Sequence, residues 1–594
     1  MKYFEDHIDQ FQKQDTRLSS LFNQISTIRI VTFVIALIVA IYAADIPNAK
    51  LLGVVVLLFL VSFVILIKWH NRVRYERNHA RFMKQINDDE TKRLKGDLSS
   101  FETGEEFGSD KHYYANDLDT FGRNSLYQLL NRCTTITGKA MLSKWLLAPA
   151  EKEEIVMRQE AVIELSKHPD FCQNFEAVGL HHEDEKASFE PLENWLKEEA
   201  QVLSKRWLSI AKYVLPAIST ALLIGVAWFD VSYVYLLLIF IVNGVLLKTV
   251  FQYSLEITKQ TGDGVSTLAG IADLVLEIEK IEVHADKLKG IKDDFTTNGA
   301  KVSNRIKRLT KILDFLNARA NVLYIGFNAL FLIDIHLISL TEQWKIDNRD
   351  NVKKWFSGVS EFEVLCSFAR FAFANPSYVQ PEILDDDYCL EVTGIGHPMI
   401  KPDERVSNDF KAQDKGRVII ITGSNMSGKS TFLRTVGVNA VLALAGAPVC
   451  ATQMSISRML VFTSMRTQDN LEEHISSFYA ELKRIKELLS LVESSGVPVM
   501  FMLDEILKGT NSHDRHKGGV AIVHQLHKAN AIGFVSTHDI ELGQEAAKLQ
   551  YCDNYSFNSE VVGNNISFDY KINDGVCQSF NASALMRNIG IEIE

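Results

Sequence analysis

Two pairs of long apolar runs constrain the fold of this chain more than any other feature of its 594 residues. The first pair comprises residues 30–44 and 51–67, and the second comprises 213–229 and 233–247, joined by little more than Asp230. A membrane-spanning helix needs roughly 20 mostly apolar residues, with about 17 as the lower limit. Two of the runs reach that limit, and neither pair shows a polar stripe of helical period. The pattern predicts two transmembrane helical hairpins, with buried core helices or interfacial hairpins as the alternative.

Basic residues flank these runs at the ends away from the hairpin tips, whereas the tips carry only Lys50. Because cytoplasmic flanks are enriched in Lys and Arg, we expect the tips to face outward and the large segments to stay in the cytoplasm. The seven cysteines are scattered and form no C-x-x-C pair, which agrees with a reducing compartment. The expected location is the inner or plasma membrane, with the lipid bilayer as a partner and several spans. The flanking cations are Arg29, Lys68, Arg72, Arg74, Arg77, Lys205, Arg206, Lys212 and Lys248.

The rest of the chain divides into helical and mixed segments. Residues 78–112 are polar and acidic, which is typical of a linker. From about Glu391 short β-rich runs alternate with helical ones, which predicts a parallel sheet with crossover helices. The apolar run 322–333 contains Asn328 and is expected in the protein interior. The expected units are 1–77 (N-terminal helix and first hairpin), 78–112 (linker), 113–206 (first helical part), 207–250 (second hairpin), 251–385 (second helical part) and 386–594 (α/β domain).

A glycine-rich loop follows the buried-strand pattern at 418–421 and precedes a helical stretch. It matches G-x-x-x-x-G-K-[ST], in which the glycines let the backbone wrap around phosphate and the helix N-terminus offers free N–H groups. We expect Lys429 to reach the β- and γ-phosphates and the Ser430 hydroxyl to bind Mg²⁺. The loop predicts a site for a nucleoside triphosphate, namely ATP. Its residues are Gly423, Ser424, Asn425, Met426, Ser427, Gly428, Lys429, Ser430 and Thr431.

Two further strand patterns end in polar residues that complete this site. The run 499–503 ends in Asp504, which suits the water shell of Mg²⁺, and Glu505, which suits a base for the attacking water. The run 533–536 leads to His538, which can bond the γ-phosphate; a partly exposed structural histidine is the alternative. The expected catalytic residues of an ATPase are therefore Lys429, Glu505 and His538. The fold class that follows is a multidomain chain: an α-helical core domain with two transmembrane hairpins, then a C-terminal α/β P-loop domain of the ABC type.

These motifs resemble those of the MutS DNA mismatch repair ATPases. Residues 422–431 are similar to that family's T-G-P-N-M-G-G-K-S-T, 504–510 to its D-E-I-G-R-G-T, and 536–542 to its A-T-H-Y-x-E-L. Ser476-Ser-Phe478 falls where the family has S-T-F, a segment that reaches the nucleotide of the partner subunit. The resemblance implies a homodimer formed through the ATPase domains, with Ser476 acting in trans.

The resemblance covers roughly 113–205 and 301–590, and the departures from it are informative. No segment resembles the family's mismatch-reading domain, whose place is taken by the first hairpin. Arg405 lies near the position where the family often has an aromatic residue for adenine, and a guanidinium can stack on a base. Leu507 and Lys508 replace the family's Gly and Arg. The resemblance implies an ATP-driven, clamp-like switch that binds duplex DNA without strong mismatch preference.

Candidate DNA contacts come from Lys301, Arg305 and Arg308, which fall on one face of an expected helix. A solvated face, or a face against anionic lipid, is the alternative. The net charge of −11 excludes a protein that coats nucleic acid through its whole surface. A half of an ABC-type transporter would need an L-S-G-G-Q segment, which the chain lacks. A MutS-like membrane switch that acts on a protein or membrane partner without DNA stays open.

Overall fold

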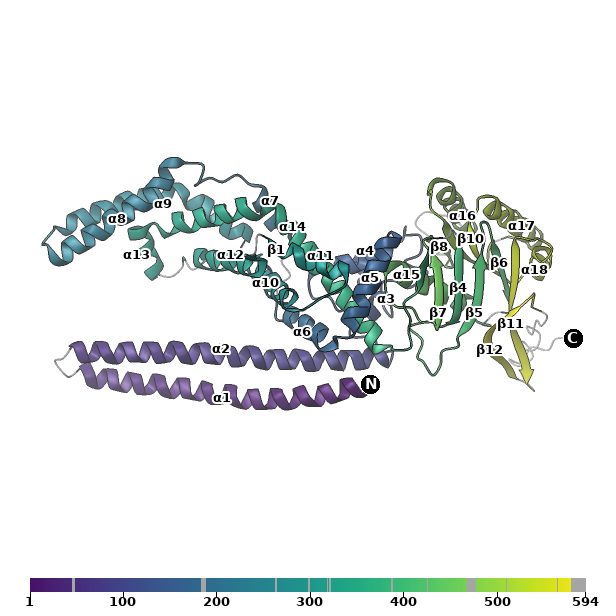
Figure 1. Ribbon diagram of the computed structural model, residues 1–594, viewed down its shortest axis with the longest axis horizontal. Helices are drawn as coiled ribbons and strands as arrows, with labels where there is room; N and C mark the ends of the chain where they lie inside the picture. The colour runs from purple at the N-terminus through teal and green to yellow at the C-terminus, as the bar shows by residue number, and fades with distance from the viewer. Residues whose placement is uncertain are drawn as a thin grey trace.

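The computed structural model describes residues 1–44, 49–182, 189–261, 264–297, 300–317, 319, 322–385, 388–424, 426–466, 477–508, 510–562 and 565–577. Two residues of the expected nucleotide site, Asn425 and Ser476, lie outside these ranges. Figure 1 shows an elongated molecule in which helices occupy one part and the large sheets lie at the opposite end. A helical N-terminal region followed by a C-terminal α/β domain is thereby confirmed.

The first hairpin consists of α1 (Lys2–Ala44) and α2 (Ala49–Leu94), which pack side by side along their length (Figure 1). The prediction of a linker beginning at residue 78 was wrong, because α2 continues without a break to Leu94. Met83 and Ile86 are buried one turn apart and pack with Ala177 of α6 (Pro169–Leu180). The polar composition of this segment therefore belongs to the outer face of a helix that docks on the core.

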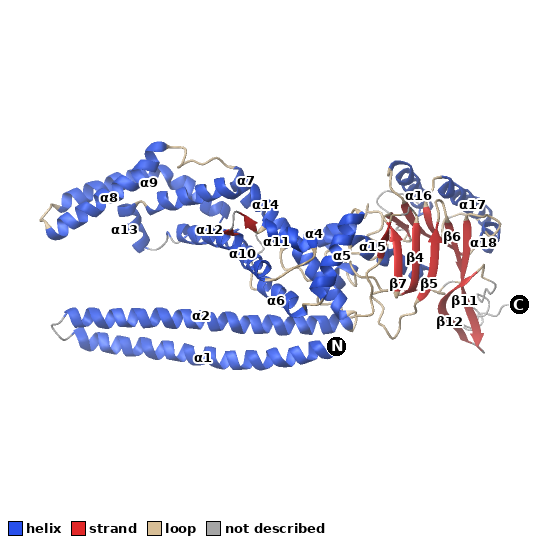
Figure 2. Cartoon of the chain, in the orientation of Figure 1, coloured by secondary structure: helices blue, strands red, loops and turns tan. Residues whose placement is uncertain are grey.

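The helical core is built from two stretches of the chain that are separated by the second hairpin. Its longest element is α14 (Ile333–Ala374), which runs from that hairpin toward the sheets (Figure 2). Glu363 of α14 accepts hydrogen bonds from the backbone N–H groups of Thr134, at 2.8 Å, and Thr135, at 3.1 Å, so the two stretches pack as one unit. The other core helices are α3 (Leu126–Leu130), α4 (Ile136–Leu147), α5 (Lys152–Ser166), α7 (Phe189–Lys197), α10 (Gly264–Lys280), α11 (Asp286–Asp294) and α12 (Val302–Asn317), with short strands β1 (Thr296–Thr297) and β2 (Ala300–Lys301).

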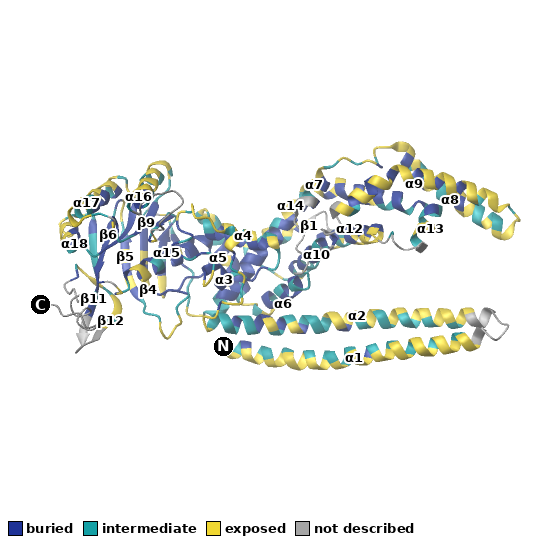
Figure 3. Ribbon diagram, turned by 180° about the vertical axis from the view of Figure 1, so that it is seen from behind, coloured by how far each residue is buried: buried dark blue, intermediate teal, exposed yellow. Residues whose placement is uncertain are grey.

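The second hairpin consists of α8 (Arg206–Trp228) and α9 (Tyr233–Thr261), with the short helix α13 (Val322–Phe331) lying against both. The expectation that this short run lies in the protein interior was wrong, because Ile325 and Phe327 are more than half exposed. By length and composition, α1, α2, α8 and α9 each satisfy the requirements for crossing a membrane. Their apolar surfaces are mostly exposed, as Figure 3 shows toward both hairpin tips.

The α/β domain positions the functional residues. Its six-stranded sheet has the order β12-β11-β6-β10-β9-β8, in which only the β11–β12 pair is antiparallel. The parallel register places the carboxyl ends of β6, β9 and β10 at one edge. These strands are β6 (Val418–Gly423), β8 (Leu460–Ser464), β9 (Val499–Asp504), β10 (Ile532–Thr537), β11 (Cys552–Val562) and β12 (Asn565–Asp574).

A second sheet of four strands covers the start of this domain, in the order β3-β7-β4-β5. Helices α16 and α17 connect strands of the larger sheet, as the alternating sequence pattern predicted. The strands of the second sheet are β3 (Glu382–Leu384), β4 (Cys389–Ile395), β5 (Asn408–Gln413) and β7 (Gln453–Ser457). The helices of the domain are α15 (Lys429–Ala445), α16 (Ser477–Ser494), α17 (Ser512–Lys528) and α18 (Ile540–Ala546).

Candidate functional site

The loop between β6 and α15 turns closely around the first residues of the helix. Gly428 forms the N-cap of α15 with φ 106°, a left-handed conformation that favours glycine. A Cβ atom on Gly428 would lie 3.0 Å from the ring of Tyr570, and one on Gly423 would lie 2.9 Å from the carbonyl oxygen of Phe557. The two glycines of the motif are therefore required by backbone conformation and by close packing. The turn presents the free N–H groups of a 17-residue helix to the space above it.

Lys429 folds back over this loop. Its Nζ donates to the carbonyl oxygens of Gly423 and Ser424, at 2.9 Å each, and burial lowers the pKa of its ammonium group. Within the described part of the chain, the hydroxyls of Ser424 and Ser427 are buried without a hydrogen-bond partner. An ammonium group held by weak carbonyl acceptors, beside unpartnered hydroxyls and helix N–H groups, fits a phosphate ligand.

The parallel register brings two acidic residues to the same edge. Ser536 lies opposite Asp504 in the sheet and donates its hydroxyl to that carboxylate. Glu505 follows with φ 52°, and its backbone N–H donates to the carbonyl oxygen of Ser536 at 3.0 Å. Asp504 and the exposed Ser430 at the start of α15 are the side chains here whose oxygens suit Mg²⁺.

Glu505 forms two ion pairs across the site. Its Oε1 lies 2.5 Å from Nε2 of His538, and its Oε2 lies 2.8 Å from Nζ of Lys508. The hydrogen bond from His538 lowers the pKa of Glu505 to about 2, with a further contribution from Lys508. His538 Nδ1 lies 2.9 Å from the carbonyl oxygen of Gly423, so both nitrogens of this ring face oxygen atoms. The three residues expected to be catalytic, Lys429, Glu505 and His538, therefore lie together at one edge of the sheet.

A cavity of about 500 Å³ opens above the loop. Tyr570 of β12, whose ring is 45% exposed, stands at its edge with φ 55°. Asn408 holds this residue in place, because its Nδ2 donates to the carbonyl oxygen of Tyr570 at 3.1 Å and its Oδ1 accepts from the N–H of Ile572 at 2.9 Å. Sequence reasoning assigned no role to Tyr570.

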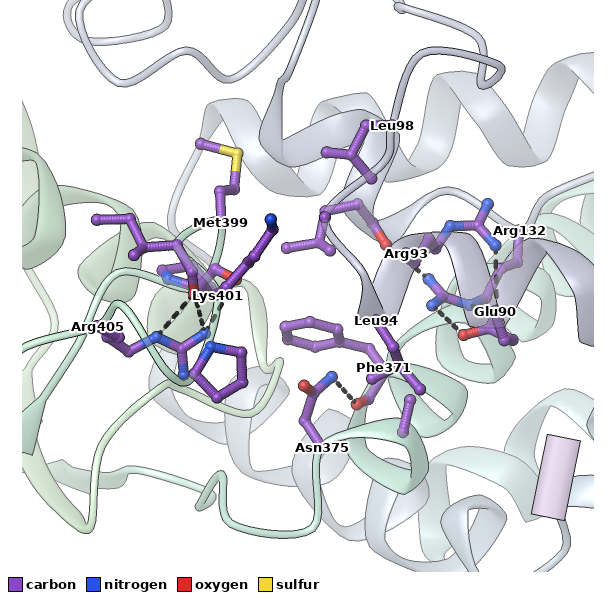
Figure 4. A pocket seen from close by; sticks show the side chains of 16 residues that line it. Glu90, Arg93, Leu94, Leu98, Arg132, Phe371, Asn375, Met399, Lys401 and Arg405 are labelled. Carbon is purple, nitrogen blue, oxygen red and sulfur yellow. Dashed lines mark hydrogen bonds and ion pairs between the residues drawn. The ribbon is translucent and has the colours of Figure 1, made fainter. Parts of the chain in front are cut away.

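The expectation that Arg405 lies at the adenine position was wrong. Its guanidinium donates to the carbonyl oxygen of Ile400 from Nε at 3.0 Å, and it lies 3.0 Å from Sγ of Cys450. It also lies over the ring of Tyr378, 5.6 Å from the ring centre. These contacts turn Arg405 away from the 500 Å³ cavity, which it does not line, and into a second, smaller cavity (Figure 4).

This second cavity, of about 50 Å³, lies at the end of α2. Glu90 of α2 is buried beside it and pairs with Arg132 at 2.7 Å and Arg93 at 3.2 Å (Figure 4). It also pairs with Arg370 of α14 at 2.8 Å. Ile400 lines both cavities, so the connection between β4 and β5 forms a shared wall between them. The wall places the end of the first hairpin directly behind the loop site.

The candidate DNA contacts lie far from this edge of the sheet, on the helical core. Lys301 and Arg308 are exposed. Arg305 is half-buried and donates to the side-chain oxygen of Asn348 at 3.3 Å. The structure therefore places two of the three cations on a free face and engages the third with α14.

Two family models match this chain, both describing parts of MutS proteins. The model of MutS domain V matches residues 419–588, and the model of MutS domain III matches residues 111–189. The first match contains the 423–431 loop, Asp504, Glu505 and His538. The second covers the beginning of the helical core.

Curated relatives with the name DNA mismatch repair protein MutS agree with these matches. The protein from Finegoldia magna is 26% identical over 512 residues, which cover 78% of this chain and 57% of that protein. The protein from Fusobacterium nucleatum subsp. nucleatum is 32% identical over 227 residues (37% of this chain, 25% of that protein), and the protein from Zymomonas mobilis subsp. mobilis is 30% identical over 306 residues (50% and 34%). The chain spans between a quarter and just over half of the length of these relatives. With the site geometry and two domain matches in agreement, the chain belongs to the MutS family.

Proposed function

We propose that this protein is a membrane-anchored ATPase that binds ATP with Mg²⁺ on the 423–431 loop and hydrolyses it. The observation that carries the proposal is the convergence of Lys429, Asp504, Glu505 and His538 at the carboxyl ends of β6, β9 and β10. Open α/β sheets bind ligands at this edge. Ser430 and Asp504 would hold Mg²⁺, which supplies charge neutralisation to the phosphates when bound.

The chain's own residues have separable tasks in this reaction. Lys429 exchanges its loop carbonyls for phosphate oxygens, which are stronger acceptors for an ammonium group. Glu505 orients a water molecule against the γ-phosphorus and takes its proton as the bond to the leaving oxygen of ADP breaks. His538, between Glu505 and the carbonyl oxygen of Gly423, links this carboxylate to the loop. Tyr570 offers an aromatic ring for the adenine base at the edge of the cavity.

The proposed assembly is a homodimer through the α/β domains, with Ser476 reaching the partner's nucleotide. We further propose duplex DNA, without strong mismatch preference, as the substrate of the resulting clamp-like switch. Support comes from the relatives, which are named DNA mismatch repair proteins and of which one matches 78% of this chain. We propose that the present chain is located in the cell membrane, with both hairpin tips outside and the remaining domains in the cytoplasm.

A second candidate is a switch that acts on a membrane or protein partner without DNA. It is favoured by one observation: the end of α2, a candidate membrane helix, lies against the wall of the nucleotide cavity. ATP binding that displaces this wall would move the first hairpin directly.

ATPase assays on the detergent-solubilised full chain separate the two candidates. Hydrolysis is measured at low salt alone, with a perfect duplex and with a mispaired duplex. Equal stimulation by both duplexes supports the DNA proposal, and a strong preference for the mispaired duplex contradicts the expected lack of mismatch reading. An ATPase rate that neither duplex changes, together with no binding of either duplex to the protein, would favour the second candidate. Absence of ATP binding would reject both.

A further inference from the structure

The short helix α13 lies against the apolar middle of the second hairpin. A groove of about 580 Å³ separates them and contains almost no polar surface. Leu223, in its lining, falls in the middle of the apolar run 213–229. The groove is lined by Leu223, Tyr233, Leu236, Leu237, Phe240, Gly326, Phe327 and Leu330. Residues 326–330 therefore lie well inside the depth that the hairpin spans.

The chain turns sharply between α13 and α14. Leu332 has φ 53°, a left-handed conformation, and the helices on either side of it are bent by 79°. After the turn, His336 of α14 meets the ring of Tyr213 with the ring centres 5.4 Å apart. Because Tyr213 begins the apolar run of α8, α14 returns to the cytoplasmic edge of the hairpin within one helical turn. The bend and the return to Tyr213 fit a re-entrant segment, which enters and leaves a membrane on the same side.

Several polar groups at the turn are paired inside the protein, whereas Oδ1 of Asn243 and the two terminal nitrogens of Arg319 are buried without a hydrogen-bond partner among the described residues. Asn243 of α9 is buried and donates to the carbonyl oxygen of Ala329, at 2.8 Å, at the open end of α13. The side-chain oxygen of Asn328 accepts from the N–H of Asp334 at 2.9 Å. Asp334 in turn pairs with Arg319 at 3.2 Å. These contacts fix the turn between α13 and α14 against α9.

The helix that leads into this segment carries a stripe of exposed residues on one face. Its members follow helical spacing and end in an aromatic residue: Asn304, Arg308, Lys311 and Phe315. The exposed Lys301, at the end of β2, directly precedes the helix. Phe315 is 63% exposed. Arg305 borders the stripe on one side, and the exposed Asp314 borders it on the other. A change from cationic to apolar along one face is typical of helices that enter a membrane surface.

We infer that α12 and α13 form a binding surface for an anionic phospholipid of the cytoplasmic leaflet. Arg308 and Lys311 meet the headgroup phosphate, and Phe315, Ile325 and Phe327 contact the acyl chains. Charge complementarity selects the headgroup, since the stripe presents cations where an anionic leaflet begins. Duplex DNA would match the cations but leave the apolar half of the stripe exposed to water. The inference rests on the proposed membrane placement of the second hairpin.

Lipid retention by the full chain tests the headgroup contact. The protein is reconstituted in nanodiscs of phosphatidylcholine with phosphatidylglycerol, and the lipids that stay bound are counted by native mass spectrometry. Arg308→Gln with Lys311→Gln should reduce the preference for phosphatidylglycerol about tenfold or more, because each cation near an anionic surface contributes about 1 kcal/mol. Lys353→Gln with Lys354→Gln, two exposed cations on α14, is the matched control and should leave the preference unchanged.

Two results would overturn the inference. One is an unchanged lipid preference in the Arg308 and Lys311 double variant; if the same variant also loses duplex DNA binding, the stripe belongs to DNA. The other is ready labelling of Phe327→Cys in intact membranes by a water-soluble maleimide. Protection of this cysteine from the maleimide supports insertion, as does quenching of a fluorophore attached to it by brominated acyl chains. Alkaline extraction separates these failures from failure of the proposed function, because a chain released by that wash is not membrane-embedded at all.

Discussion

Oε1 of Glu505 lies 2.5 Å from Nε2 of His538, so the carboxylate expected to activate water is already held by a neighbouring side chain. Nζ of Lys508 lies 2.8 Å from the other carboxylate oxygen and forms a second ion pair with Glu505. Both groups favour the ionised carboxylate, which is the form that can accept a proton from water. Hydrolysis requires that one of these contacts gives way to the water molecule, which makes the pair a control point for turnover.

The pH dependence of turnover follows from these contacts. The pKa of Glu505 is lowered from 4.5 to about 2, so the carboxylate contributes stability above pH 4.5 that is lost as pH falls from 4.5 toward 2. Turnover by the wild-type chain should therefore not decline through protonation of Glu505 at pH 5. Lys508→Ala removes one cause of the shift, so its kcat/KM should begin to fall at higher pH than that of the wild type. Lys517→Ala, an exposed lysine on α17, is the control, and coincident pH profiles for all three proteins would contradict the assignment.

Glu90 should be essential for docking α2 on the core. Burial opposes its ionisation, but the guanidiniums of Arg132, Arg370 and Arg93 outweigh that effect and lower the pKa of Glu90 to about 2. This stabilisation is present above pH 4.5, the ordinary value, and is lost between pH 4.5 and 2. Glu90→Gln removes the carboxylate that pairs with Arg132 and Arg93 and leaves Arg370 with Glu176 alone, so it should cost about 3 kcal/mol or more. The midpoint of thermal unfolding in detergent at pH 7 measures this loss.

The control for that change is Asp89→Asn, which removes the adjacent carboxylate where it pairs with the partly exposed Lys92. Its unfolding midpoint should lie near that of the wild type, since pairs of this kind contribute little. If Glu90→Gln and Asp89→Asn unfold alike, the buried cluster does not hold α2 in place.

Topology can be read with reporter fusions on the full chain. Fusions at Asn48 and Asp230, at the two hairpin tips, should report the outside, because the cations flank the opposite ends of the helices. Fusions at Gly104 and Glu594 should report the cytoplasm. A cytoplasmic signal from either tip would mean that the corresponding hairpin does not cross the membrane.

A mixed dimer tests the proposed trans role of Ser476. One chain carries Lys429→Ala and the other Ser476→Ala, so only one of the two composite sites is intact. Pure mixed dimers should recover about half of the wild-type ATPase activity, and a statistical mixture about a quarter, whereas each variant alone should have little. Activity of the mixture no higher than that of the separate variants would show that Ser476 does not serve the partner's site.

The sequence predicted which residues the candidate site brings together, because the elements of that site are local. A strand, a glycine turn and a helix follow each other directly around Lys429, and the register of parallel strands then aligns Asp504 and His538 with them. The side chain of Arg405 was misplaced because its partners, Ile400 and Cys450, come from a loop whose path the sequence pattern does not encode.

The two helical hairpins show the same limit. The hairpin runs were visible in composition, but the continuation of α2 to Leu94 was not, since the burial of Glu90 depends on arginines from two distant segments. Likewise, the exposure of α13 depends on how Asn243 and Leu332 set its turn against the second hairpin. The local periodicity of a sequence predicts that a segment is helical. The elements that pack against the helix decide which of its faces is buried.

Separating ATP binding from ATP turnover in two variants tests the central claim most directly. Lys429 meets phosphate in the ground state, whereas Glu505 acts on water only as the transition state forms. Lys429→Ala should therefore lose tight binding of a fluorescent ATP analogue, whereas Glu505→Ala should keep near wild-type affinity and lose turnover by a factor of about 100 or more. An equal loss of nucleotide affinity in both variants, or turnover that survives Glu505→Ala, would contradict the account.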